Sequence, residues 1–238
     1  MVTKWLHLDE RGGGDEWIIP IWQAMRRAQA ANDVQPASQE IRELGLHIYT
    51  RLNILHRICS RLDSEVRDLF DFAKGTHRST HVFTKDREGA ALRVNDDLKY
   101  HLLADVDALL YEIDSCAELM RKLFQKLHAH AGDQIPQAEL TDKLRSVLRR
   151  NGDSGDWFKL LNQMRNFVAH QGTPYVAIDI SHDENWDLLF MKQNLRGFEE
   201  PEKYFTLSQL KMVAGGFRKS KKLLQEHLVG LFGGASRT

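Results

Sequence analysis

The chain has 238 residues, 42% of them hydrophobic, and is long enough to form one large domain or two small ones around a sizeable core. Its 33 basic residues balance its 33 acidic residues, which argues against a DNA-coating protein, since that affinity comes from many phosphate contacts, but leaves room for an RNA site on a local basic patch. No apolar run approaches the roughly 18 residues of a membrane span, and charged residues follow Met1 closely in place of a signal-peptide core, so we expect no membrane contact and a cytoplasmic location.

The N-terminal segment, residues 1–35, predicts one short docking helix. A flexible Gly-rich break at residues 11–15 precedes it, and the spacing of its apolar residues predicts a helix over 16–31. Pro20 suits the first turn of that helix. Trp17 and Trp22 on so short a helix indicate that it docks on a larger body.

A long bundle helix is predicted from Ser38, which is a good N-cap, to Lys74. Its core positions recur every three or four residues at Ile41, Leu44, Ile48, Leu52, Leu55, Ile58, Leu62, Val66, Leu69 and Phe72. Gly45 is expected to bend this helix slightly.

Residues 75–95 are polar and without a period, which predicts a long loop. His77 and His81 have the spacing of metal ligands one helical turn apart, but no paired Cys accompanies them, so we assign no metal and no cofactor. Cys59 and Cys116 lie within helical patterns without metal-type spacing, and we expect reduced, buried thiols.

A second long helix is predicted from a cap at Asp96 or Asp97 to Ala131. One face of it is acidic and carries Asp105, Asp107, Glu112, Asp114 and Glu118. The plain interpretation is a solvated face. The alternative is that one of these carboxylates pairs with an arginine further along the chain, Arg165, and orients it.

Shorter elements follow. A helix is predicted over 137–150, and the alternation in 175–180 and 186–191 predicts a β-hairpin, which must pack on the bundle or on a partner because two strands alone are marginally stable. Thr206 caps a last helix to Leu231, and the tail 233–238 is expected to be disordered. The predicted fold is an all-α bundle in a single domain, 1–238, with a core over 38–172 and a small hairpin insertion over 175–191.

The helix predicted over 157–172 ends in a polar cluster. Asn166 and His170 are four residues apart and share a face, while Arg165 lies about 100° round the helix but can fold its long side chain back. The core side of this helix carries Leu160, Leu161, Met164, Phe167 and Val168, and Gly172 and Pro174 end it.

Arg-x4-6-His spacing also occurs at Arg42 and His47, Arg51 and His56, and Arg121 and His128. Three features distinguish the Arg165 site: a polar residue follows the arginine directly, the site lies late in the chain, and the helix ends within two residues of the histidine. The plain alternative is a helix C-terminal cap and surface pair.

Arg165, Asn166 and His170, late on a helix in an all-helical chain, resemble the R-x4-6-H motif of the HEPN domain superfamily, which usually has Asn, Asp or His after the Arg. Members include RNA-cleaving toxins, antiphage nucleases and RNA-processing enzymes, together with proteins that kept the fold and lost catalysis. The resemblance implies a HEPN-like bundle acting as a metal-independent endoribonuclease. It also implies RNA as substrate, a homodimer that brings two motif helices together, and an antitoxin or defence-system partner.

In this role, His170 would act as general base or acid, Arg165 would hold the phosphate, and Asn166 would fix the histidine tautomer or contact RNA. Two features depart from the family: Gly172 stands where some toxins carry a modifiable Tyr, and the hairpin exceeds a minimal bundle. A non-catalytic HEPN-like module that binds RNA or a protein is the alternative function. The basic segment 218–222 is either a solvated helix face or an RNA track.

Overall fold

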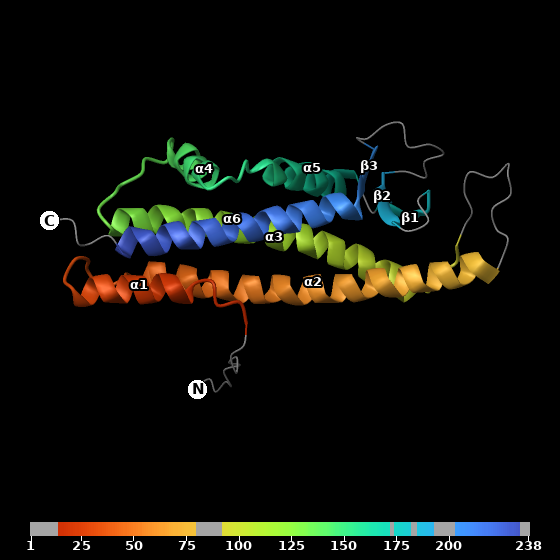
Figure 1. Ribbon diagram of the computed structural model, residues 1–238, viewed down its shortest axis with the longest axis horizontal. Helices are drawn as coiled ribbons and strands as arrows, with labels where there is room; N and C mark the ends of the chain where they lie inside the picture. Colours follow the sequence, from red (N-terminus) through yellow and green to blue (C-terminus); the bar gives the residue numbers. More distant parts are fainter. Residues whose placement is uncertain (1–13, 80–91, 172–173, 182–184, 193–202, 234–238) are drawn as a thin grey trace, which may run out of the picture.

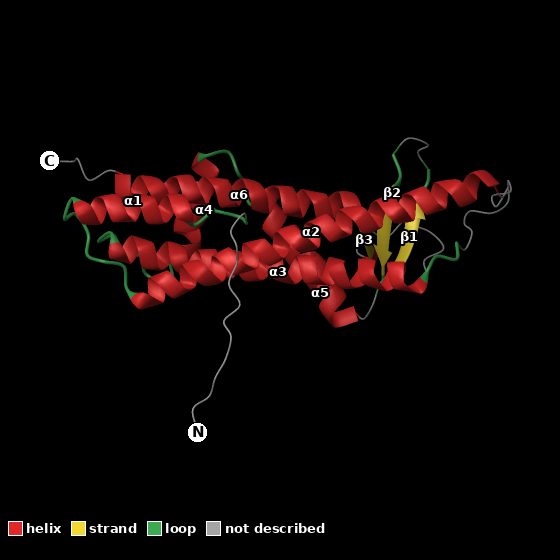
Figure 2. Ribbon diagram, turned by 90° about the horizontal axis from the view of Figure 1, so that it is seen from below, coloured by secondary structure: helices red, strands yellow, loops and turns green. Residues whose placement is uncertain are grey.

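The computed structural model describes residues 14–79, 92–171, 174–181, 185–192 and 203–233. Within these ranges the chain forms six helices and one three-stranded antiparallel sheet near the C-terminal end (Figure 2). The predicted all-α fold with two long helices and a small β insertion is confirmed.

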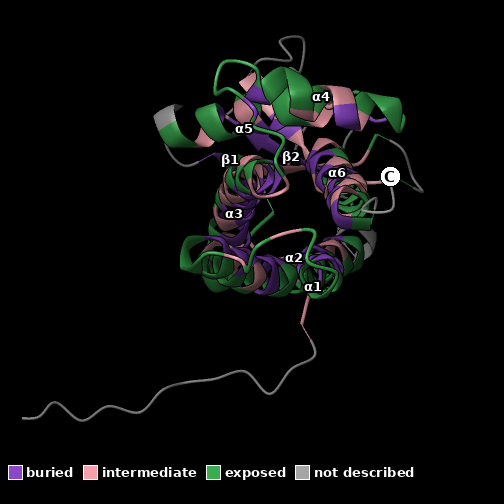
Figure 3. Ribbon diagram, turned by 90° about the vertical axis from the view of Figure 1, so that its left-hand side faces the viewer, coloured by how far each residue is buried: buried purple, intermediate pink, exposed green. Residues whose placement is uncertain are grey.

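The helices form three layers, with α1 and α2 in the first, α3 and α6 in the second, and α4 and α5 over α3 and α6 (Figures 1 and 3). Their bounds are Ile19–Ala30 for α1, Gln39–Ser79 for α2, Asp96–His130 for α3, Leu140–Arg150 for α4, Asp156–Gln171 for α5 and Leu207–Gly233 for α6. Buried apolar side chains from all six helices join one continuous core cluster. In the described part of the chain, none of these helices combines the length and apolar character that crossing a bilayer requires.

The α2–α3 pair is joined by two ion pairs as well as by its apolar stripes. Arg51 Nη1 donates to both carboxylate oxygens of Glu112 at 2.8 and 2.9 Å, and Arg61 forks onto Asp105 at 2.8 and 2.6 Å. Both carboxylates are buried, so the expectation of a fully solvated acidic face is wrong at these two positions. A buried carboxylate requires a cationic partner, and α2 supplies one arginine to each of the two.

Several predicted helix ends are corrected. α2 continues to Ser79, five residues past the expected end, because an established helix propagates at little cost and no breaker lies between Gly75 and Ser79. The expected loop therefore begins later, and residues 80–91 lie outside the described ranges. Phe72 was assigned to the core stripe, but it is exposed near the end of α2.

Other boundaries depend on caps. Asn95, not Asp96 or Asp97, caps α3, and its side chain accepts from the Asp97 N–H at 2.9 Å. Thr206 caps α6 as predicted: its hydroxyl accepts from the Gln209 N–H while the Gln209 side chain accepts from the Thr206 N–H, which is a capping box. Ser38 likewise accepts from the Ile41 N–H at 3.3 Å.

Two short helices begin later than their patterns indicate. α1 begins at Ile19, with Pro20 in its first turn as expected, and α4 begins at Leu140. Before α4, the Glu139 N–H bonds the Pro136 carbonyl, so residues 137–139 form a turn. An apolar period does not resolve one turn of this kind from the first turn of a helix.

The sheet contains one strand that the sequence analysis missed. β1 (Tyr175–Asp179) and β2 (Asp187–Met191) form the predicted hairpin, with Tyr175 opposite Met191. β3 (Tyr204–Thr206) pairs with the other edge of β2, and Phe190 stacks on Phe205 at 4.8 Å between ring centroids. The hairpin packs on the bundle through these buried side chains, as its marginal intrinsic stability requires.

α1 and the residues just before it dock on α6 and α2 through two tryptophans. Trp17 is buried, and the ring of Trp22 lies so close to Gly45 of α2 that a Cβ there would overlap it. Gly45 therefore serves close helix approach, and the structure gives this glycine a packing role where the sequence predicted a bend.

α5, which carries the Arg165 cluster, is held at both ends. At its start, Trp157 lies against Gly216 of α6 and donates its indole N–H to the Ser220 hydroxyl at 2.8 Å. Near its end, Phe167 meets Phe205 of β3 edge to face at 5.2 Å. The buried side of α5 carries Leu161, Met164 and Phe167, as predicted, with Leu160 and Val168 partly buried beside them.

The two adjacent glycines of α6 provide a matched test of this seating. A Cβ at Gly216 would overlap Trp157, whereas a Cβ at Gly215 would meet nothing within 4 Å. We expect Gly216→Ala to lower the free energy of unfolding by about 1–3 kcal/mol through overpacking. Gly215→Ala should raise it by about 0.5–1 kcal/mol through helix propensity. Urea unfolding of both variants checks this, and a stabilised Gly216→Ala protein would contradict the seating of α5.

Candidate functional site

The polar cluster on α5 begins with an arginine that is exposed but held. Arg165 Nη1 donates to Asp114 Oδ2 on α3 at 2.7 Å, and the two side chains are 47% and 24% exposed. The expectation that a carboxylate of the acidic α3 face pairs with Arg165 is therefore confirmed, and Asp114 is that carboxylate. The pair spans the edge along which α5 lies on α3.

The next two members lie in the last two turns of the same helix. Asn166 is exposed. His170 lies in the last turn of α5, one residue before the helix ends at Gln171, and its side chain is outside the described residues. The helix thus ends within two residues of His170, as predicted, and its backbone places His170 one turn beyond Asn166.

Arg165 differs from the other arginines that match an Arg-x-His spacing. Arg51 is committed to both oxygens of buried Glu112, and Arg121 forks onto Glu118 with two bonds of 2.9 Å. Arg165 is bonded to described residues through Nη1 alone. Arg42 is exposed near the start of α2, far from the C-terminal end of that helix.

This single bond leaves Arg165 suited to an anion. A guanidinium carries five N–H donors in a planar fork, so one bond to Asp114 fixes the group while the remaining donors can meet two oxygens of a phosphate. Because the pair is partly exposed, its contribution to stability is small, of the order of 1 kcal/mol or less. Orientation of the guanidinium is thus the larger consequence.

A second candidate region, which the sequence analysis missed, is an open groove of about 580 Å³ between the segment leading into α1 and the middle of α6. Its lining residues are Asp15, Glu16, Trp17, Pro20, Gly215, Arg218, Lys219, Lys221, Lys222 and Gln225. The basic segment 218–222 thus forms one wall. No residue of α3 or α5 lines the groove, so it is separate from the Arg165–Asp114 pair.

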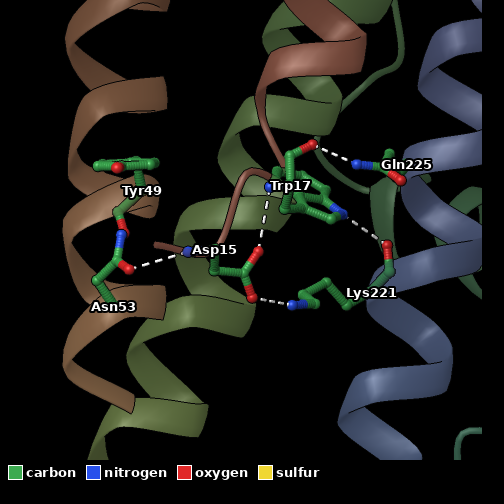
Figure 4. Close-up of polar contacts among 6 residues, drawn as sticks. All are labelled: Asp15, Trp17, Tyr49, Asn53, Lys221 and Gln225. Carbon is green, nitrogen blue, oxygen red and sulfur yellow. Dashed lines mark hydrogen bonds and ion pairs between the residues drawn. The ribbon is translucent and has the colours of Figure 1, made fainter. Parts of the chain in front are cut away.

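A network of polar contacts holds the opposite wall of the groove in place (Figure 4). Asp15 pairs with Lys221 and also accepts from the Trp17 N–H, while its own N–H donates to Asn53 of α2. The Trp17 indole donates to the Lys221 carbonyl at 2.7 Å, and Gln225 donates to the Trp17 carbonyl. These partners lie up to 208 residues apart in sequence, so no local sequence pattern predicts their contacts.

A third cluster is a pair of stacked histidines where α3 ends against α6. His128 Nε2 lies 3.0 Å from Nε2 of His227, and His128 Nδ1 lies 2.9 Å from Oδ2 of Asp133. Asp133 accepts from Nδ1–H, so the neutral His128 ring accepts at Nε2 from the Nε2–H of His227. Burial lowers the pKa of both histidines, and the pKa of His227 is lowered further by electrostatic interaction with His128 and with the cations Lys143 and Arg150.

Thiol and metal chemistry have little support in the described residues. Cys59 and Cys116 are free thiols, and burial raises the pKa of Cys116 to about 12, which keeps it protonated. In the described part of the chain, no three His, Cys, Asp or Glu side chains converge as metal ligands. His81 and the side chain of His77 lie outside that part.

The histidine pair predicts a pH dependence of stability. A histidine whose pKa is lowered in the folded state favours folding fully above its unfolded value, near 6.5, and this contribution is lost as the pH falls below that value. We therefore expect the free energy of unfolding to fall between pH 7 and pH 5, and to fall less in His227→Gln, which keeps a donor but does not titrate. His47→Gln, an exposed site on α2, is the control and should behave as wild type in urea unfolding at both values. An unchanged pH dependence in His227→Gln would contradict this account.

Comparisons with known proteins found no relative of this chain. The sequence matches no family model, and no curated protein and no solved structure matches the chain. The candidate sites are therefore judged on their own geometry and chemistry.

Proposed function

We propose that the protein is a metal-independent endoribonuclease of HEPN type that cleaves RNA with Arg165, Asn166 and His170. The observation that supports this most is the state of Arg165: an exposed guanidinium, oriented by one bond to Asp114, beside exposed Asn166 and within two helical turns of the end of α5. An oriented cation with spare donors is what a phosphoryl-transfer site needs.

The reaction is an internal transfer at one phosphodiester. His170 takes the proton of a ribose 2′-hydroxyl, whose oxygen attacks the adjacent phosphorus. The bond from phosphorus to the 5′-oxygen breaks, and that oxygen leaves as a hydroxyl after receiving a proton. Arg165 binds the non-bridging oxygens and stabilises the charge that builds up on them. The products are a 2′,3′-cyclic phosphate and a 5′-hydroxyl end.

Asp114 acts through Arg165 and is a positioning residue. A long side chain without a partner samples many rotamers, and the bond to Asp114 removes that cost before RNA binds. Asn166 supplies an amide that can contact the ribose or fix the His170 tautomer. A second copy of the chain, with its own α5 beside the first, supplies the acid that one Arg–His pair lacks, and the active form is a homodimer.

The biological role that fits this activity is a toxin or an antiphage-defence nuclease acting in the cytoplasm. An RNA-cutting enzyme of this kind must be restrained, which implies an antitoxin or a defence-system partner protein. β1 is an edge strand of the described sheet and offers such a partner a surface outside the bundle core.

One observation favours the alternative, a non-catalytic HEPN-like module that binds RNA or a protein. Asp114 competes with phosphate for Arg165. If the Arg165–Asp114 pair stays closed, Arg165 has a structural role and does not bind the reacting phosphate. The two functions separate in a cleavage experiment, because a binding module retains RNA without cutting it.

The proposed site predicts cleavage of total tRNA or mRNA by the purified chain in EDTA. Arg165→Ala should slow the reaction about 10²–10³-fold through loss of charge stabilisation, and His170→Ala about 10²–10⁴-fold through loss of proton transfer. Arg42→Ala, which removes an exposed arginine of α2, is the control and should cut as wild type. Circular dichroism checks that each variant is folded.

Two results would decide against the proposal. Equal cleavage by wild type, Arg165→Ala and His170→Ala would show that these residues do not form the active site. Retention of RNA by a folded wild type that never produces a cyclic phosphate end would favour the binding module.

A further inference from the structure

The face of α6 that lines the groove carries more positive charge than its surroundings neutralise. Arg218 and Lys222 are exposed and lie four residues apart, on one side of the helix. The lining holds four cations and two acidic residues, Asp15 and Glu16. Lys221 is paired with Asp15, and Lys222 makes a contact of 3.8 Å with Glu226. In a chain with no net charge, this is a local concentration of cations.

The same charge continues beyond the groove. Lys219 donates to the carbonyl of Gly152, in the turn between α4 and α5. Arg149 and Arg150 end α4 directly before that turn, and both are exposed. The cations of α6 and α4 therefore form one basic surface, which lies over α6 between α1 and the α4–α5 turn.

The floor of the groove is apolar. Pro20 and the buried Trp17 lie on one side, and Gly215 presents no side chain on the other, so the space above it stays open. The network around Asp15 fixes this wall, which makes the groove a preformed feature of the fold. A preformed apolar floor beside exposed cations suits a ligand with flat apolar parts and regularly spaced negative charges.

We propose that this groove, with the basic surface of α6 and the end of α4, binds the backbone of single-stranded RNA at a site distinct from Arg165. Single strands combine phosphates with unstacked bases, whereas a duplex hides the faces of its bases from the apolar floor. The inference rests on the proposed function for its choice of RNA over other anionic polymers. It adds a second contact that holds a long substrate while α5 acts on it.

The test measures binding apart from cleavage. The probe is a fluorescein-labelled oligouridine of about 20 nucleotides, longer than the site of a single binding groove. His170→Ala serves as the background so that the probe stays intact. Into it we introduce Arg218→Gln with Lys222→Gln, or, as a matched control, Lys122→Gln with Lys126→Gln, which removes two charges four residues apart on α3.

The groove variant should bind the probe roughly 10-fold or more weakly than the background at moderate salt. Its dependence of log K on log salt should flatten by about 1.4, since each lost phosphate contact contributes about 0.7 on a single strand. The α3 control should match the background in both quantities. Equal anisotropy titrations for the groove variant and the α3 control would overturn the inference, as would tighter binding of polyglutamate than of oligouridine.

Failure of this inference and failure of the proposed function give different results. If RNA binds through the groove but wild type never cuts, the groove assignment stands and the ribonuclease does not. If wild type cuts while the groove and control variants bind the probe equally well, the ribonuclease stands and the groove assignment falls.

Discussion

The contact on which the candidate site depends is the seating of α5 in the angle between α3 and α6. Trp157 reaches α6 only because Gly216 has no side chain there, and Ser220 takes its indole N–H. These contacts at Trp157 and Phe167 fix the orientation of α5 about its own axis. In that orientation Arg165 faces α3 and Asn166 faces solvent. A small rotation would separate Arg165 from Asp114 and expose Met164, so packing and site geometry are set together.

The other half of the pair is fixed by α2. Arg51 binds Glu112 and Arg61 binds Asp105, and both carboxylates are buried, so a slip of α3 along α2 would leave two buried charges without partners. Each buried carboxylate would then lose its charged partner, which disfavours a slip and makes the register of α3 well defined. Asp114 follows Glu112 by two residues and inherits that register. The polar contacts therefore specify where the site lies more than they add to overall stability.

Sequence periodicity was sufficient for the long helices and the hairpin, because each buries an apolar face with its own regular spacing. It did not reveal β3, since three residues are too few for alternation and the strand exists only by pairing with β2. Nor did it separate buried Asp105 and Glu112 from exposed acidic neighbours, because their burial follows from arginines some 44 and 61 residues away.

The candidate site divides in the same way. Local signals placed Arg165, Asn166 and His170 at the end of one helix, and an acidic face on α3 offered a partner, but only the fold selects Asp114 from that face. The groove escaped prediction because its walls come from opposite ends of the chain, and the histidine pair joins residues 99 positions apart. Charge in the segment 218–222 was visible in sequence, while the apolar floor beside it was not.

A double-mutant cycle on single-turnover RNA cleavage measures whether Asp114 prepares Arg165 for phosphoryl transfer. Asp114→Asn in wild type should slow cleavage roughly 10-fold, by analogy with the loss of other orienting partners. Asp114→Asn in the Arg165→Ala background should slow cleavage no further, because Asp114 acts on the reaction only through the Arg165 side chain. Equal slowing by Asp114→Asn in both backgrounds, or none in either, would contradict the account.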